Sequence, residues 1–281
     1  MRVAQLGAGR PSVAVVGALH GDEPCGATAV ERLLEDDPPV REPVKLIIAN
    51  DEALERDVRY VDADLNRAFE ESVPEDAHER DLAEQLATEL EGTTTLALHS
   101  TQSYPYPFAI ASGVDDTVRS IAPRLSVRAL VDAGEKDSGR VFETNADIIE
   151  VEAGLQKSDA AAENAYRIAR EFLSATGVLP GETAPRELPI YRMGEPIEKP
   201  SASAYEVFAE NFRRVEDQEP FAASDGRDVI ADGAFYPILL SAYGYRDIFG
   251  YRGEKVGTLS PGYEDPDGAS STSSSSRSNA Q

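Results

Sequence analysis

Short apolar segments alternate with helical patterns through the first two thirds of the chain. Four of these segments are rich in branched residues and are too short for most buried helices, so each is predicted to form a buried strand. The segments between them repeat apolar residues at i, i+3 and i+4, which predicts amphipathic helices. This alternation predicts a mixed, mostly parallel sheet with helices on both faces. The predicted strands are 13–19, 44–49, 94–98 and 147–151, and the predicted helices are 24–35, 79–91 and 157–175.

The pattern changes after the last predicted helix. Gly and Pro cluster at 177–189, and the segment 188–258 has the pattern of short strands joined by turns. The chain then ends in a Ser-rich stretch with almost no apolar residues, which is typical of disorder. We therefore predict three parts: an α/β domain at 1–182, a small β-rich domain at 183–262 that contributes to the pocket, and a disordered tail at 263–281.

Composition excludes several classes of partner. The 281 residues carry a formal net charge of −24, from 51 acidic and 27 basic residues, so nucleic acid and anionic membranes would be repelled. The acidic excess and the scarcity of lysine favour a halophilic protein. A single cysteine, Cys25, excludes an internal disulfide. The N-terminal stretch lacks a signal-peptide layout and no apolar run reaches the ~18 residues of a membrane span, so we expect a cytoplasmic protein.

Polar side chains with strong chemistry follow three of the predicted strands. His20 and Glu23 come after the first strand, His99 after the third and Glu152 after the fourth. In open α/β sheets the ligand crevice lies beyond the carboxyl ends of the strands. These four side chains are therefore expected to converge at one edge of the sheet.

Two imidazoles and one carboxylate are the ligand set of a catalytic zinc that keeps one position open for water. His20 and Glu23 are three residues apart in a turn that leads into a helix, where Pro24 suits the first helical position, so both side chains can reach one ion. His99 would come from a neighbouring strand. The third histidine, His78, begins a surface helix without partners of the same kind and is interpreted as a solvated helix end.

Four motifs resemble those of the succinylglutamate desuccinylase/aspartoacylase family, which is related to the zinc carboxypeptidases. They occur in the order typical of that family, and the resemblance runs from about residue 12 to about residue 252. The motifs are GALHGDE, RYVDADLNRAF, LHST and EVEAG.

The resemblance implies a role for each residue of the predicted metal site and its base. His20, Glu23 and His99 match the three zinc ligands, with one zinc per chain. Glu152 matches the general base that activates water. Glu150 is an alternative that strand alternation cannot exclude, because both acids point to the same face, but the Gly two positions further on favours Glu152.

The resemblance also implies a set of substrate contacts. Arg59 matches an arginine that polarises the scissile carbonyl, and Asp62 and Asp64 could orient the arginines of this loop. Tyr243 lies close to the matched tyrosine and is an alternative to it. Arg140 is the only candidate for a further arginine upstream of the base, and its spacing does not fit cleanly. The residues expected to bind substrate are Asn66, Arg67, Tyr245 and Arg140.

These features together predict a zinc-dependent hydrolase that cleaves the amide bond of an N-acyl amino acid. The roles also follow from general chemistry: zinc lowers the pKa of water, a carboxylate moves the proton, and an arginine stabilises the developing oxyanion. A zinc carboxypeptidase on short peptides could share every site residue, and a non-catalytic binding protein could retain the same scaffold. The expected partner is a small substrate, with no nucleic acid or membrane and a possible homo-oligomer.

Overall fold

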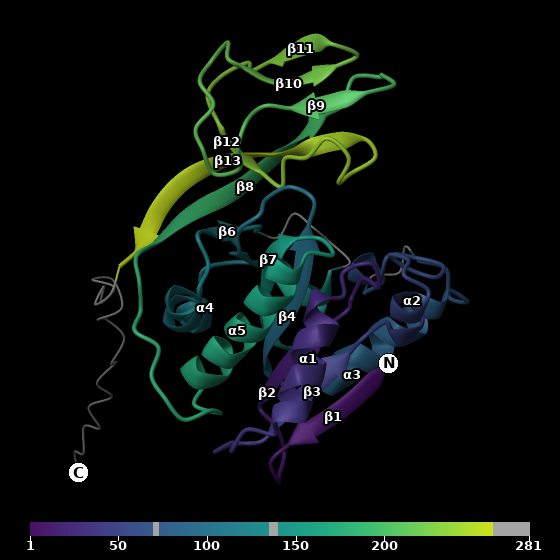
Figure 1. The fold of residues 1–281 in the computed structure, drawn as a ribbon, viewed down its shortest axis with the longest axis vertical. Helices are drawn as coiled ribbons and strands as arrows, with labels where there is room; N and C mark the ends of the chain where they lie inside the picture. The colour runs from purple at the N-terminus through teal and green to yellow at the C-terminus, as the bar shows by residue number, and fades with distance from the viewer. Residues whose placement is uncertain (70–72, 135–139, 261–281) are drawn as a thin grey trace, which may run out of the picture.

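The computed structural model describes residues 1–69, 73–134 and 140–260. A ten-stranded sheet forms its centre (Figure 1). Along the sheet, the second to fifth strands are parallel neighbours, and so are the sixth to eighth strands. The remaining neighbours are antiparallel. The order is β1 (Arg2–Leu6), β3 (Val44–Ile48), β2 (Val13–Gly17), β4 (Thr94–Thr101), β7 (Asp147–Leu155), β5 (Phe108–Ala111), β6 (Leu130–Asp132), β8 (Leu188–Glu198), β13 (Ile248–Leu259) and β12 (Tyr236–Ile238).

Helices cover both faces of the parallel strands. Val15 of β2 packs in one core cluster with α1 (Cys25–Asp36), α4 (Asp116–Ile121) and α5 (Asp159–Ala175). Its neighbour Val16 packs in a second cluster with α3 (His78–Leu90) on the other face. A buried strand alternates its side chains between two faces, so the apolar run of β2 serves both layers. The predicted mixed, mostly parallel fold with helices on both faces is confirmed.

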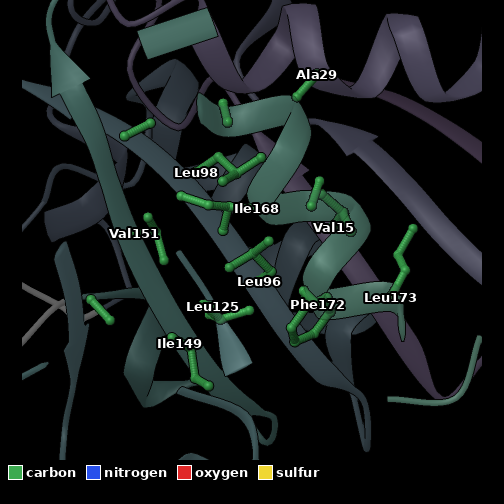
Figure 2. Close-up of a cluster of buried hydrophobic side chains, with 14 of the residues drawn as sticks. Val15, Ala29, Leu96, Leu98, Leu125, Ile149, Val151, Ile168, Phe172 and Leu173 are labelled. Atoms are coloured by element: carbon green, nitrogen blue, oxygen red, sulfur yellow. The ribbon is translucent and has the colours of Figure 1, made fainter. Parts of the chain in front are cut away.

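The cluster on the α1 and α5 face shows why these segments are helical. Ile168 and Phe172 are four residues apart in α5, which places them on one face, and both are fully buried. Figure 2 shows them lying over Leu96 and Leu98 of β4. Burying a side chain of this size contributes about 1.5–3 kcal/mol, so this packing fixes the helix against the strand that carries His99.

The C-terminal part continues the main sheet. β8 pairs in parallel with β6 and antiparallel with β13, and both β8 and β13 are longer than the short strands expected there. A separate three-stranded sheet of β9 (Tyr205–Val207), β10 (Pro220–Ser224) and β11 (Arg227–Ile230) lies beyond them, at the top of Figure 1. The boundary proposed at residue 182 falls between α5 and β8 and stays a prediction.

Short helical segments complete the described part of the chain. They are the helix α2 (Asp51–Glu55) and the 3-10 turns Leu65–Arg67, Ala122–Arg124 and Val141–Glu143. Within the described ranges, no helix combines the length and the apolar character needed to cross a membrane. The tail predicted at 263–281 lies outside the described residues.

Candidate active site

The turn between β2 and α1 carries the first two residues of the site. His20 and Glu23 are both buried, and the Glu23 amide donates a hydrogen bond to the His20 carbonyl at 3.2 Å. The start of α1 lies so close to the strand end that a Cβ on Gly17 would come within 2.2 Å of the Gly26 backbone. Gly17 therefore lets the helix begin directly beside the sheet edge, with Glu23 pointing along that edge.

His99 completes a compact cluster of potential metal ligands. The ligand atoms of His20, Glu23 and His99 all lie within 4.8 Å of one another. Nδ1 of His20 is 2.9 Å from one Glu23 oxygen, and Nδ1 of His99 is 3.1 Å from the other. His20 and Glu23 follow β2, and His99 lies within the neighbouring parallel strand β4, near its carboxyl end and not after it as expected. The three side chains meet at one sheet edge, as the strand-end argument predicted. Two imidazole nitrogens and a carboxylate aimed at one point match the donor set of a catalytic zinc site.

The electrostatics of the cluster also favour a cation. Burial alone would raise the pKa of Glu23, but the two histidines lower it well below its usual value. Burial alone would lower the pKa of His20, but Glu23 and Asp64 raise it to about 9. The acids therefore favour the charged form of His20, and a divalent cation bound to the same atoms would replace its proton.

A loop before the Leu65–Arg67 turn brings an arginine to this cluster. Arg59 donates to Glu23 at 3.1 Å and forms an ion pair with Asp64 at 3.0 Å. Asp64 also lies 3.0 Å from Nε2 of His20, a contact that sequence reasoning missed. Burial would raise the pKa of Asp64, but His20 and Arg59 lower it. Asp64 thus orients Arg59 and the His20 ring together, which is the arrangement that commonly fixes metal-binding histidines.

Glu79 of α3 holds the loop between Arg59 and Asp64 in place. Its fully buried carboxylate accepts hydrogen bonds from the backbone amides of Val61, Asp62 and Ala63 at 2.6, 3.0 and 3.0 Å. The Asn50 side chain donates a fourth at 2.9 Å. Sequence analysis did not single out Glu79, because one acid in the first turn of a helix has nothing to distinguish it from its exposed neighbours.

Replacement of Glu79 by glutamine is expected to lower both stability and activity. The glutamine amide group would face backbone N–H donors, leaving buried donors unsatisfied at a cost of about 1–3 kcal/mol. Burial would raise the pKa of Glu79, but the amides of Val61 and Ala63 lower it, so its contribution is present above pH 4.5 and fades as the pH falls through the lowered value. Thermal unfolding and kcat/KM measure both effects. Glu84→Gln on the exposed side of α3 is the control, and equal behaviour of the two variants would contradict this role.

A second buried network lies on the other side of His99. Arg140 forms an ion pair with Glu150, whose other oxygen accepts from the Asn66 amide at 2.9 Å. The Asn66 carbonyl oxygen accepts from the backbone amide of Val141 at 2.9 Å. Burial would raise the pKa of Glu150, but Arg140 and His99 lower it. Glu150 is therefore a charged group with partners, placed 3.8 Å from Nε2 of His99.

Glu152 differs from Glu150 although both point to the same face. It lies directly beside His99 in the β4–β7 register, at the mouth of the cluster. Its Oε2 is shielded from solvent and has no hydrogen-bond partner among the described residues. Burial and the nearby Glu23 raise the pKa of Glu152 to about 7. A carboxyl group with a shielded oxygen that no described residue contacts by a hydrogen bond, and with a pKa raised toward neutrality, is suited to move protons.

All the residues predicted for the site line one cavity of about 450 Å³. Tyr245 lies in its wall, whereas Tyr243 is 64% exposed and its hydroxyl accepts from the Tyr205 amide. Burial raises the pKa of Tyr245, so its hydroxyl stays protonated. His78 lies outside this cavity, 3.7 Å from Glu52. The lining includes His20, Glu23, Arg59, Asn66, Arg67, His99, Arg140, Glu150, Glu152 and Tyr245.

The fold and the site together define an α/β protein with a histidine–glutamate–histidine cluster and an acidic group at the carboxyl edge of its sheet. Residues 9–176, more than half of the chain, match the catalytic domain of the succinylglutamate desuccinylase/aspartoacylase family. The chain belongs to this family, as its four motifs predicted.

A curated relative matches a short part of the chain. An N-acyl-aromatic-L-amino acid amidohydrolase (carboxylate-forming) of Xenopus laevis is 42% identical over 60 residues, a match that covers 20% of each chain. This chain therefore matches about one fifth of the length of that curated relative.

Solved structures share the fold over nearly the whole chain. Murine aminoacylase 3 has a TM-score of 0.70 at 22% identity, covering 90% of this chain and 99% of its own. Succinylglutamate desuccinylase from Vibrio cholerae has a TM-score of 0.69 at 20% identity, covering 91% and 84%. A succinylglutamate desuccinylase/aspartoacylase from Rhodobacter sphaeroides has a TM-score of 0.73 at 18% identity, covering 90% and 88%.

Proposed function

We propose that this protein is a zinc-dependent hydrolase that cleaves the amide bond of an N-acyl amino acid. The observation that carries the proposal is the Glu152 carboxyl group, whose Oε2 has no hydrogen-bond partner among the described residues, in one cavity with the His20–Glu23–His99 cluster. The family assignment supports an amide hydrolase, and the Xenopus laevis relative is named for this kind of reaction.

His20, Glu23 and His99 would hold one zinc ion. When bound there, zinc lowers the pKa of a water molecule toward ~7 and polarises a carbonyl group. His20 is kept in place by a further contact, since Asp64 lies 3.0 Å from its Nε2, whereas Glu150 lies 3.8 Å from Nε2 of His99 as a charged neighbour. The contact with Asp64 orients the His20 ring before any metal arrives.

Glu152 acts as the general base and then as the general acid. It takes a proton from the water whose oxygen forms a bond to the acyl carbonyl carbon. As the carbon–nitrogen bond breaks, Glu152 passes that proton to the leaving nitrogen, so a carboxylic acid and a free amino acid result. A pKa near neutrality suits both transfers.

Arginines complete the proposed chemistry. Arg59 stabilises the negative charge that develops on the carbonyl oxygen, since it already lies beside the ligand cluster. Arg67 offers its guanidinium to a substrate carboxylate, and the Tyr245 hydroxyl donates a further hydrogen bond to it. Asn66 and Arg140 were also expected to bind this carboxylate, but in the structure both contact Glu150.

A substrate panel tests the proposal. Purified protein supplied with zinc is assayed with N-acetyl-aspartate, N-succinyl-glutamate, N-acetylated aromatic amino acids and a set of dipeptides. Hydrolysis of at least one acylated amino acid, in preference to the dipeptides, is the expected result. Preferential release of C-terminal residues would identify a carboxypeptidase, and binding without turnover of any compound would identify a non-catalytic protein. Either outcome would overturn the proposal.

We propose further that the protein works in a salt-rich cytoplasm, from its net charge of −24. Screening by salt weakens the repulsion among its acidic groups. The panel is therefore run at both low and high salt, and activity is expected to be greater at high salt. Higher activity in dilute buffer would contradict the salt adaptation without affecting the proposed reaction.

A further inference from the structure

The arginines that line the cavity differ in whether their charge is paired with an acidic side chain. Arg59 is paired with Glu23 and Asp64, and Arg140 is paired with Glu150. Arg67 also lines the cavity, and among the described residues its hydrogen bond goes to the backbone carbonyl of Asn66 at 2.6 Å. Arg246 also lines the cavity, but its side chain is 94% exposed. Arg67 is thus the half-buried cavity arginine that has no ion pair among the described residues, so its charge is open to an incoming carboxylate.

Glu150 takes up both donors that would otherwise face a second carboxylate. One of its oxygens receives the Asn66 amide and the other receives Arg140, the kind of donors that bind carboxylates. The side-chain oxygen of Asn66 accepts from the Val141 amide at 2.9 Å, which holds the NH2 group of Asn66 toward Glu150. Glu150, Asn66 and Arg140 are 1%, 4% and 7% exposed, so the network is part of the protein interior.

Displacing Glu150 would be costly. Separating a buried ion pair leaves an uncompensated charge, which is strongly destabilising. A second substrate carboxylate that entered without displacing it would lie beside a charged Glu150 and be repelled. The cavity lining also includes Tyr60, Leu239 and Tyr245, which can contact uncharged groups.

We infer that Glu150 is a specificity-determining residue that fills the place of a second substrate carboxylate, so that the site selects N-acyl amino acids carrying a single carboxylate. This inference rests on the proposed function. Arg67 would bind the one carboxylate, and the amino acid side chain and the acyl group would both be uncharged.

The unmodified protein gives the decisive test. N-acetyl-glutamine and N-acetyl-glutamate have nearly the same shape and differ by one charge, so their kcat/KM values isolate the effect of the second carboxylate. We expect the glutamine derivative to be preferred by at least about tenfold. Equal values, or a preference for the glutamate derivative, would overturn the inference while leaving the proposed reaction intact.

Binding measurements distinguish a failure of the proposed function from a failure of this inference. If no acylated amino acid is hydrolysed, the proposed function fails, and calorimetry with glutaramate and glutarate then examines the inference alone. Tighter binding of glutaramate, which has one carboxylate, supports it. Equal or tighter binding of glutarate, or binding of neither, counts against it.

Variants identify the residue responsible. Glu150→Gln keeps the shape of the side chain but removes the charge that pairs with Arg140, so the preference should shift toward N-acetyl-glutamate by about tenfold or more. Adding Arg140→Gln to this variant should remove that gain, because the guanidinium charge is then lost as well. Glu84→Gln, an exposed change on α3, should retain the original preference. An unchanged preference in folded Glu150→Gln would contradict the role, and if that variant does not fold, the ratio for the unmodified protein decides.

Discussion

Glu152→Gln is expected to lower kcat by about 10²–10⁴-fold, the range associated with loss of a general acid–base group. Glutamine has the same shape as glutamate but cannot accept a proton from water or return one to the leaving nitrogen. Because Oε2 of Glu152 has no hydrogen-bond partner among the described residues, the change breaks no observed contact at that atom. The loss should therefore appear in kcat, with little change in thermal stability.

The comparison with Glu150 makes this prediction specific. Both acids line the cavity from β7, but Glu150 is held by Arg140 and Asn66. Glu150→Gln should alter substrate preference and stability more than the chemical step, whereas Glu152→Gln should do the reverse. Rate measurements at saturating substrate, together with elemental analysis of bound metal, distinguish the two. If Glu152→Gln turned over at the rate of the unmodified protein, Glu152 would not be the base.

The parallel half of the fold follows from local sequence pattern. The strand predicted at 13–19 is β2, which ends at Gly17, and the helix predicted at 24–35 is α1, which begins at Cys25. Both predictions succeed because buried strands and amphipathic helices differ in length and in apolar period. The meeting of His20, Glu23 and His99 was also predictable, because carboxyl ends of parallel strands share one edge.

The contacts that distinguish similar residues could not be predicted from the sequence. Alternation along β7 places Glu150 and Glu152 on one face. Contacts with Arg140 and with Asn66, which is 84 residues away, are what distinguish Glu150 from Glu152. Glu79 likewise gains its importance from the distant loop at 61–63. Such long-range pairings depend on tertiary packing, which local periodicity does not record.

The extension of the sheet by β8 and β13 was missed for a similar reason. These strands pair with each other along most of their length, and their register shifts near Gly250, Gly253 and Gly257. Irregular pairing interrupts the apolar alternation, so the sequence has the pattern of several short strands instead of two long ones.

Removal of zinc is expected to abolish hydrolysis and to lower the melting temperature, with both restored by added zinc. His20, Glu23 and His99 lie together in the interior, so a cation that binds them would stabilise the folded state in proportion to its affinity and concentration. Before the metal binds, burial opposes the charged form of His20 but Glu23 and Asp64 raise its pKa to about 9, so the ring carries a proton at pH 7. Metal uptake must displace that proton, and apparent affinity should therefore rise with pH up to about 9.

Calorimetry in two buffers with different ionisation enthalpies measures the proton released on uptake. Glu23→Gln is the matched variant, because it keeps the shape of the ligand and removes the charge that both Nδ1 atoms face. It should bind zinc much more weakly and lose activity with it. Full activity in protein stripped of metal, verified by elemental analysis, would contradict the zinc site. Uptake without proton release would contradict the charged state of the ring, because a neutral His20 could bind the cation without losing a proton.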